Sequence, residues 1–360
     1  MNAAESFSAS YAEARARFRD AASGAGGALE SIANPNRGPD GGDLSTDVAW
    51  FGPRDAEKVL VTVCGTHGVE GFCGSGAQVD WLRRGEAAAL PAGVAALVVH
   101  AINPYGFAWL RRVTEENVDL NRNWIDFAAA PPANPGYDEL ASAAVPDEWS
   151  EAAQVQSAAT LRAYAQRHGA LALQQALSGG QFRHADGVFY GGTAPSWARR
   201  TQEAIYREYL GGAGQVAIID YHTGLGPWGF GEAIMTEAAR TPAFRRARGW
   251  YGARLTTPAD GSSASAPIAG DNLGAAPGLL PHAEVTGMAL EFGTVSLART
   301  FLALRADAWL HARGDPASPQ GRAIKAMVRE AFYGDADDWK GMIAGQSLVA
   351  CRQAVAGLGG

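Results

Sequence analysis

Two residues in the first quarter of the chain have side chains and a spacing that suit metal binding. His67 and Glu70 are separated by two residues in the stretch VTVCGTHGVEGFCGSGAQ, residues 61–78. A catalytic zinc ion uses three nitrogen or oxygen ligands from the protein and keeps one position open for water. His222 could supply the third ligand from another strand end. Taken singly, each of these residues is also compatible with a purely structural role.

Two carboxylates could assist such a metal ion. Asp220 precedes His222 by two positions, so in an extended strand both side chains lie on one face, where Asp220 could orient the imidazole. Glu291 ends the apolar run in MALEFGT. Burying a carboxylate is costly unless it has a partner or a purpose, and near a metal it could accept and return a proton. The structural alternative for Glu291 is a helix cap or an ion pair with an arginine.

Arginines and an asparagine in NPYGFAWLRRVTEENVDLNRNW, residues 103–124, could bind a substrate carboxylate. A guanidinium group presents a planar fork that matches a carboxylate, and a second one can hold an oxyanion. The candidates are Arg111, Arg112, Asn121 and Arg122. The alternative for Arg111 is a surface loop with ion pairs to the acidic residues of the same stretch, namely Glu115, Glu116 and Asp119.

Strands and helices must alternate along the chain to position these residues. Continuous β-branched and apolar runs predict strands over 46–52, 58–65, 93–102, 215–224 and 285–294, with 232–237 as a further candidate. Helical periodicity predicts helices over 5–24, 70–84, 149–177 (one helix or a pair), 195–210 and 242–253, and within 296–333. Composition predicts loops over 34–43, 128–149 and 259–267.

This alternation predicts an α/β fold: a three-layer α/β/α sandwich around a mixed, mostly parallel, twisted sheet. We expect an N-terminal helix and linker (1–44), a catalytic domain (45–335) and a C-terminal tail packed on that domain (336–360). Ligands of such sheets bind beyond the carboxyl ends of the strands. Polar residues follow or end four of the predicted strands, and we expect them at one edge: His67, Asn103, His222 and Glu291.

Charge and composition exclude several classes of partner. The net charge is −7 and the pI is near 5.5, without a basic run, so we expect no nucleic-acid partner. The longest apolar stretch, around 94–102, is too short to cross a membrane, and the N-terminus has no secretory pattern. We therefore expect a cytoplasmic protein; its N-terminal helix covers the sheet edge or meets a second copy in a homo-oligomer.

The three cysteines form no disulfide framework and no CxxC pair. We expect Cys64, Cys73 and Cys351 to be packing thiols in a reducing compartment.

Taken in order, these motifs resemble the carboxypeptidase A-like zinc metallopeptidases and their amidohydrolase relatives, the aspartoacylase and succinylglutamate desuccinylase branch. The resemblance rests on His67-x-x-Glu70, NPYGF at 103–107, DLNRNW at 119–124, His222 and Glu291. The stretches GGQFRHADGVFYGG and IDYHTGLGPWGFGE are similar to a bacterial branch described as a domain of unknown function. The resemblance covers about residues 45–300.

The resemblance implies a role for each position. His67, Glu70 and His222 would bind one zinc ion per chain, and Glu291 would act as general base and then as general acid. Asn121 and Arg122 would bind the terminal carboxylate of the substrate. Arg112 would help to hold the oxyanion, although its neighbour Arg111 leaves that transfer open. Gly65 would end the strand, and the glycines at 68 and 71 would let the backbone turn so that both ligands face the ion.

The sequence departs from the family pattern at one feature. Family peptidases carry a mobile tyrosine shortly before the catalytic glutamate, but no tyrosine lies between Tyr251 and Glu291. The polar residues of that interval are Asp271, Asn272 and His282, and we expect His282 to be a loop or supporting residue.

The implied activity is that of a zinc-dependent hydrolase acting on an amide bond next to a free carboxylate. A metallocarboxypeptidase acting on peptides or peptide-like amides is the leading interpretation. An N-acyl amino acid deacylase of the aspartoacylase type is the alternative, and an inactive binding protein on the same fold is a remote one.

Overall fold

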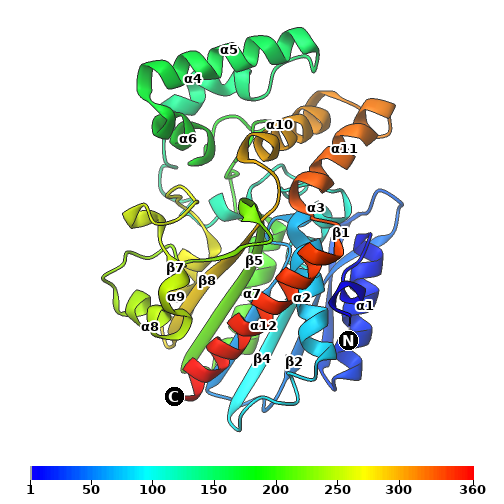
Figure 1. Ribbon diagram of the computed structural model, residues 1–360, viewed down its shortest axis with the longest axis vertical. Helices are drawn as coiled ribbons and strands as arrows, with labels where there is room; N and C mark the ends of the chain where they lie inside the picture. Colours follow the sequence, from blue (N-terminus) through cyan, green and yellow to red (C-terminus); the bar gives the residue numbers. More distant parts are fainter. Residues whose placement is uncertain (1) are drawn as a thin grey trace.

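The computed structural model describes residues 2–360 and contains one eight-stranded mixed sheet with helices on both faces (Figure 1). The strand order is β1-β2-β4-β3-β5-β8-β6-β7. The strands are β1 (Ala28–Arg37), β2 (Asp43–Phe51), β3 (Lys58–Val63), β4 (Val94–His100), β5 (Gln215–Trp228), β6 (Gly231–Ile234), β7 (Leu255–Thr256) and β8 (Glu284–Gly293).

The four central strands run parallel, as the sequence predicts. β3 pairs with β4 on one side and β5 on the other, and β5 pairs with β8. Antiparallel pairing joins β1 to β2, β2 to β4 and β6 to β8. The carboxyl ends of β3, β4, β5 and β8 therefore meet at one edge of the sheet, where ligands bind in open α/β sheets.

Twelve α-helices are present among the described residues. They are α1 (Tyr11–Gly24), α2 (Gly71–Arg83), α3 (Pro104–Ala108), α4 (Pro135–Ala144), α5 (Glu151–His168), α6 (Ala170–Ser178), α7 (Trp197–Leu210), α8 (Pro242–Tyr251), α9 (Asn272–Leu279), α10 (Leu297–Arg313), α11 (Pro319–Phe332) and α12 (Asp337–Gly359).

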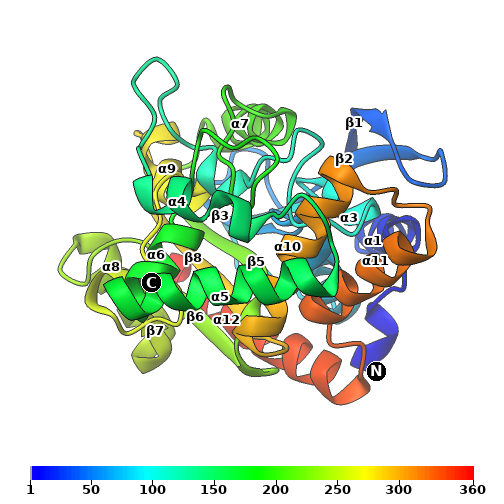
Figure 2. The ribbon, with the colours of Figure 1, turned by 90° about the horizontal axis from the view of Figure 1, so that it is seen from above.

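The sheet separates two hydrophobic layers, which confirms the predicted three-layer sandwich. Successive residues of a strand point to opposite faces, so Leu60 and Ile219 join the core under α1, α2, α8 and α12, whereas Val61 and Ile218 join the core under α7 and α9. Seen along the sheet, α7 and α9 lie on one side and α12 on the other (Figure 2).

The N-terminal segment belongs to the sheet: residues 34–37 of the expected loop over 34–43 are part of β1, and only residues 38–42 form the turn that leads to β2. α1 begins with a reciprocal cap, because Ser10 accepts from the backbone N–H of Glu13 and Glu13 accepts from that of Ala9. The chain then forms β1, an edge strand that is mostly exposed. β1 was missed because it lacks a buried apolar run and contains Pro35, which only an edge strand tolerates.

Two further segments contain helices that were not predicted from the sequence. The expected loop over 128–149 contains α4, which begins at Pro135 behind an Asn134 cap. The expected C-terminal tail is the 23-residue helix α12, and its Trp339 is fully buried against Phe7 and Tyr333. Both termini of the chain therefore contribute to one core.

Helices α4, α5 and α6, together with α10 and α11, lie beyond one end of the sheet (Figure 1). They frame the edge at which the central strands end. Within residues 2–360, no helix combines the length and the apolar character needed to cross a membrane.

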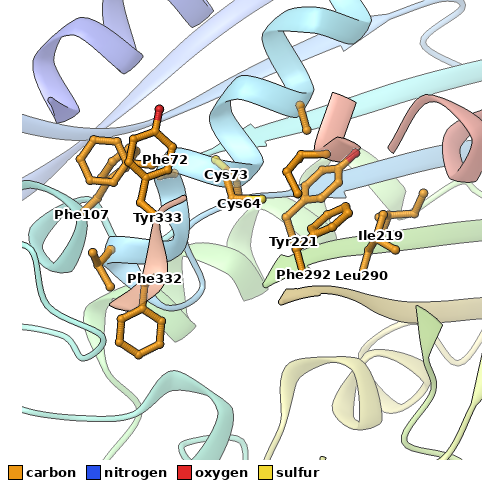
Figure 3. Packing of buried hydrophobic residues seen from close by; sticks show 14 of the residues in the cluster. Cys64, Phe72, Cys73, Phe107, Ile219, Tyr221, Leu290, Phe292, Phe332 and Tyr333 are labelled. Carbon is orange, nitrogen blue, oxygen red and sulfur yellow. The ribbon is translucent and has the colours of Figure 1, made fainter. Parts of the chain in front are cut away.

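All three cysteines are buried and unpaired, as predicted. Cys64 follows β3 and Cys73 lies on α2, where both belong to the apolar core beside Phe72 and Tyr221 (Figure 3). Burial raises the pKa of each thiol, so these residues act as small apolar groups.

Candidate metal centre and active site

The His67–Glu70 turn follows β3 directly. β3 ends at Val63, two residues before the predicted end, and Gly65 has a positive φ of 69°, which glycine adopts without strain and which turns the chain away from the strand direction. The backbone N–H groups of Gly68 and Val69 donate to the carbonyls of Arg112 and Arg111, at 3.0 and 2.8 Å. The turn is therefore held by the loop that also carries the candidate arginines.

The glycines at 68 and 71 have a different role from the one expected. Neither has a positive φ. A Cβ on Gly68 would lie 2.1 Å from the backbone of Gly106, and one on Gly71 would lie 2.5 Å from the ring of Phe107. These glycines let α3 approach the turn closely; they do not supply an unusual backbone conformation.

Three buried side chains converge at the end of β3 and β5. His67 Nδ1 lies 3.1 Å from Glu70 Oε1, and His222 Nδ1 lies 3.0 Å from Glu70 Oε2. The two Nδ1 atoms are 3.1 Å apart. The cluster unites residues separated by about 150 positions, because β3 and β5 are neighbouring parallel strands.

Each imidazole also contacts a buried carboxylate through its other nitrogen. His67 Nε2 lies 3.2 Å from Asp119 Oδ1, and His222 Nε2 lies 2.9 Å from Asp220 Oδ2. If each Nε2 donates its proton to the carboxylate, each Nδ1 is left free to bind a metal ion. Metal-binding histidines are typically oriented in this way.

This set of donors fits a divalent zinc ion. It offers two imidazole nitrogens and one carboxylate oxygen, all within 4.8 Å of one another and all buried. Two nitrogens with one carboxylate is a ligand set of catalytic zinc sites, which keep one position open.

Two of these supporting groups were not assigned from the sequence. Asp119, expected to be an ion-pair partner of Arg111, instead accepts from His67, from Arg112 Nε (2.9 Å) and from the backbone N–H of Asn121 (2.9 Å). Asn272 donates through Nδ2 to Asp220 Oδ2 at 2.9 Å. Asp119 belongs to the same DLNRN motif as Asn121 and Arg122, and this position in the motif could have indicated a role at the site.

Glu291 lies next to His222 across the sheet. The two residues are register partners on β8 and β5. Glu291 Oε1 accepts from the backbone N–H of Leu225 at 3.0 Å, and the side chain lines the cavity described below.

The two glutamates of the site have opposite electrostatic environments. Burial and the charge of Glu70 raise the pKa of Glu291. Burial would also raise the pKa of Glu70, but the two imidazoles outweigh it and lower that pKa. Pairs of carboxyl groups shifted apart in this way divide into a permanently ionised one and one that exchanges protons.

Arg112 connects the metal centre to the cavity. Its Nη1 donates to Glu70 Oε1 at 3.0 Å and its Nε to Asp119 Oδ2 at 2.9 Å. Burial would lower the pKa of Arg112, but the charges of Asp119 and Glu70 raise it. The guanidinium group stays charged, and part of it faces the cavity.

Arg122 and Asn121 lie at another part of the same cavity. Among the described residues, the Arg122 guanidinium donates only to backbone carbonyls, those of Asn121 and Ser178, and its Nε has no partner. Burial lowers the pKa of Arg122. The charges of Asp119 and Asp271 act against this effect, but among the described residues no carboxylate forms an ion pair with Arg122. An anion entering the cavity could therefore pair directly with the guanidinium group.

Three candidate residues lie away from this group. Arg111 is buried and forms an ion pair with Asp307 at 2.9 Å, and it does not line the cavity, which conflicts with the expected contact to substrate. Asn103 caps α3 by accepting from the N–H of Gly106. His282 lies 3.0 Å from the carbonyl of Leu210, in the turn before β8, as expected for a loop residue.

The cavity has a volume of about 670 Å³. His67, His222 and Glu291 form one part of its wall, together with Arg112 and Arg122. The rest of the wall is mostly apolar and comes from α6, α10 and the segment 258–273. A few convergent polar groups in an apolar pocket of this size are typical of small-molecule sites.

One protein-family model, described as "Protein of unknown function (DUF2817)", matches residues 7–346. No curated protein sequence matches the chain.

Several solved structures have a similar architecture. Carboxypeptidase A from Helicoverpa armigera is 10% identical, with a TM-score of 0.46, over 90% of this chain and 74% of that one. An aspartoacylase family protein from Mesorhizobium loti is 16% identical, with a TM-score of 0.38, over 80% and 67%. Succinylglutamate desuccinylase from Chromobacterium violaceum is 14% identical, with a TM-score of 0.38, over 84% and 74%. The likeness is one of general architecture.

Proposed function

This chain belongs to the DUF2817 family of proteins of unknown function, and we propose that it is a zinc-dependent hydrolase of an amide bond next to a free carboxylate. One observation carries the proposal. A single cavity is lined by the imidazoles of the buried three-residue cluster, by Glu291 with its raised pKa, and by Arg122, which forms no ion pair with any described residue.

The residues that would hold zinc are His67, Glu70 and His222, with Asp119 and Asp220 orienting the two imidazoles. When bound, zinc lowers the pKa of a water ligand to about 7 and polarises a carbonyl oxygen.

Glu291 is suited to move the proton. Its pKa is raised by burial and by the charge of Glu70, so it can accept a proton from the attacking water. It can then return that proton to the leaving amine nitrogen. The hydrogen bond from Leu225 holds one carboxyl oxygen and leaves the other for this exchange.

Two arginines would stabilise the oxyanion and bind the substrate carboxylate. Arg112 is fixed by Glu70 and Asp119, and its remaining N–H groups can donate to the oxyanion that develops on the substrate carbonyl. Arg122, with Asn121 beside it, would bind the free carboxylate and thereby set the position of the scissile bond. Arg111 has no part in this assignment because Asp307 holds it outside the cavity.

Peptides cleaved at the C-terminal residue and N-acyl amino acids both present this combination of amide and carboxylate. The first substrate class corresponds to a metallocarboxypeptidase and the second to a deacylase. We also propose a cytoplasmic location, which the three unpaired, buried thiols support.

A substrate panel tests the proposal. The zinc-loaded protein is incubated with peptides and N-acyl amino acids, and with counterparts whose carboxyl group is amidated, and products are read by mass spectrometry. We expect release of the carboxylate-bearing amino acid from at least one free acid, little release from its amide, and none with Glu291→Gln. Equal cleavage by the wild type and by Glu291→Gln would contradict the assignment.

A further inference from the structure

Two helices turn an apolar stripe towards the cavity. The stripes have the i, i+4, i+7 or i, i+3, i+7 spacing of one helix face. They consist of Ala170, Leu173 and Leu177 on α6 and of Leu297, Phe301 and Leu304 on α10. Apolar helix faces are normally packed against a core, whereas part of each stripe lines an open space.

Burial increases along both stripes. Leu297 is 56% exposed, and Ala170 is also exposed, so the first turn of each helix lies at the mouth of the cavity. Leu173 and Phe301 are half-buried, and Leu177 and Leu304 are buried. The two stripes therefore form an apolar channel that leads from solvent into the molecule.

The inner end of this channel meets the polar part of the site. Ser178, next to Leu177, accepts from the Arg122 guanidinium through its carbonyl. On the other wall, Thr300 Oγ1 donates to the carbonyl of Gly224, two residues beyond His222. A molecule lying in the channel would thus reach the arginine and the metal cluster.

The two helical walls of the channel offer few hydrogen-bonding partners. Apart from the six apolar residues, its helical walls present Gln174, Ser178, Ala298 and Thr300 to the cavity, and none of these side chains is charged. Thr300 Oγ1 is already engaged by Gly224. A peptide backbone here would leave buried N–H and C=O groups without partners, which is costly, whereas a hydrocarbon chain has none to satisfy.

We propose that the channel between α6 and α10 binds the hydrocarbon chain of an N-acyl amino acid whose carboxylate lies at Arg122. This inference rests on the proposed hydrolase function and selects the amphiphilic acyl amino acids within it. Water adds its oxygen to the acyl carbonyl carbon, the C–N bond breaks, and a proton from that water passes through Glu291 to the amine nitrogen. The products are a fatty acid and the free amino acid.

Binding tests the inference without hydrolysis. N-acetyl-, N-octanoyl- and N-dodecanoylglycine, below their micelle concentrations, are titrated calorimetrically into zinc-loaded Glu291→Gln, which leaves them intact. Glycine has no side chain to compete for the apolar space. The dissociation constant should fall with chain length, by up to about fourfold for each methylene removed from water. Equal dissociation constants for all three ligands would overturn the inference.

A matched pair of variants tests where the hydrocarbon chain of the ligand lies. Leu173→Gln adds a polar group to the channel, and Leu171→Gln makes the same change on the same helix at a residue that is 82% exposed and outside the cavity wall. Leu173→Gln should weaken the binding of dodecanoylglycine about tenfold and that of acetylglycine little. Leu171→Gln should leave the binding of both ligands unchanged. Equal effects of the two substitutions, or equal losses for both ligands, would contradict this placement.

Hydrolysis by the wild type separates failure of the inference from failure of the proposed function. Faster cleavage of dodecanoylglycine than of acetylglycine supports both. Cleavage of acetylglycine or of peptides with no preference for the long chain overturns the channel assignment alone. Absence of cleavage for every free acid, with zinc bound, overturns the hydrolase proposal itself.

Discussion

The two polar ends of the cavity are built differently. At the metal cluster, each imidazole has a carboxylate on its second nitrogen, and Glu70 accepts from Arg112 and from the backbone of Thr223. At the other end, Arg122 is buried, lies over the ring of Phe189 and, among the residues that the structure describes, donates hydrogen bonds only to backbone carbonyls. The charges of the first end have direct partners, whereas within residues 2–360 the guanidinium of the second end has no ion pair and is influenced by Asp119 and Asp271 only at a distance.

This difference indicates what each end binds. A cluster whose Nδ1 and carboxylate atoms face one another is arranged for a cation, because the supporting contacts direct those lone pairs inward. A buried guanidinium with an unused N–H group is arranged for an anion. Asp119 contributes to both ends, since it contacts His67, Arg112 and the backbone of Asn121.

Removing a ligand should have the largest effect. We expect His67→Ala to lose zinc and all measurable turnover. Chelation should lower the melting temperature of the wild type, because a ligand present at 100 times its dissociation constant stabilises the folded state by about 2.7 kcal/mol. Scanning calorimetry with and without chelator checks this, and an equal shift in His67→Ala would show that the metal binds elsewhere.

Glu291→Gln should have the second-largest effect. The variant keeps every metal ligand and the shape of the side chain, but it cannot exchange a proton, so we expect zinc to stay bound while kcat falls by about 10²- to 10⁴-fold. Metal analysis and steady-state kinetics on the best substrate of the panel measure the two quantities. Retained turnover would remove Glu291 from the proton transfer.

The convergence of His67, Glu70 and His222 was easier to predict from the sequence than the contacts that surround them. His67, Glu70, His222 and Glu291 were identifiable because they stand at the ends of β-branched or apolar runs, and the ends of parallel strands converge. The contacts of Asp119 with His67 and of Asn272 with Asp220 each join residues 52 positions apart, so neither pairing could be read from local spacing, although Asp119 stands in the DLNRN motif.

The same reasoning explains the errors elsewhere. β1 carries no buried run because it is an edge strand, so periodicity could not reveal it. Adjacent arginines at 111 and 112 are indistinguishable by spacing. Only the packing of α10 places Asp307 against one of them.

Arg122→Gln should affect the anionic end alone. Removing one member of a buried charge pair typically costs 2–5 kcal/mol, so we expect KM for the free acid to rise by about 30-fold or more, with zinc content unchanged. The amidated counterpart is the matched control, because the wild type and the variant should treat it alike. An equal loss on both substrates would mean that Arg122 does not contact the carboxylate.

Asp119→Asn should weaken both ends moderately. Replacing a carboxylate that orients a metal-binding histidine typically lowers metal affinity by about 10- to 100-fold. Zinc competition with a chromophoric chelator measures this affinity. Wild-type affinity in the variant would show that the contact between Asp119 and His67 does not support metal binding.

The smallest effect on kinetics should come from the Arg111–Asp307 pair, which lies outside the cavity. Asp307→Asn leaves Arg111 and Lys325 without a counter-charge, so stability should fall by about 3–5 kcal/mol while KM stays unchanged. A larger change in KM than the one caused by Arg122→Gln would contradict this and indicate that Arg111 contributes to substrate binding.

The same pair gives a dependence of stability on pH. Burial opposes ionisation of Asp307, but Lys325 and Arg111 outweigh it and lower its pKa to about 2. Because the folded pKa lies below the unfolded value of about 3.9, this stabilisation is complete above that value and is lost as the pH falls towards 2. The free energy of unfolding, measured with urea at pH 5 and at pH 2.5, should decline less in Asp307→Asn than in the wild type, because the variant lacks the carboxyl group that titrates in this range.

The zinc content of the purified chain tests the central claim most directly. The protein is purified without metal-affinity steps, and its zinc content is measured by elemental mass spectrometry after acid digestion. We expect about one zinc ion per chain for the wild type and for Glu291→Gln, and almost none for His67→Ala. A wild-type chain that holds no zinc even after incubation with the metal, or that holds as much as His67→Ala, would contradict the account.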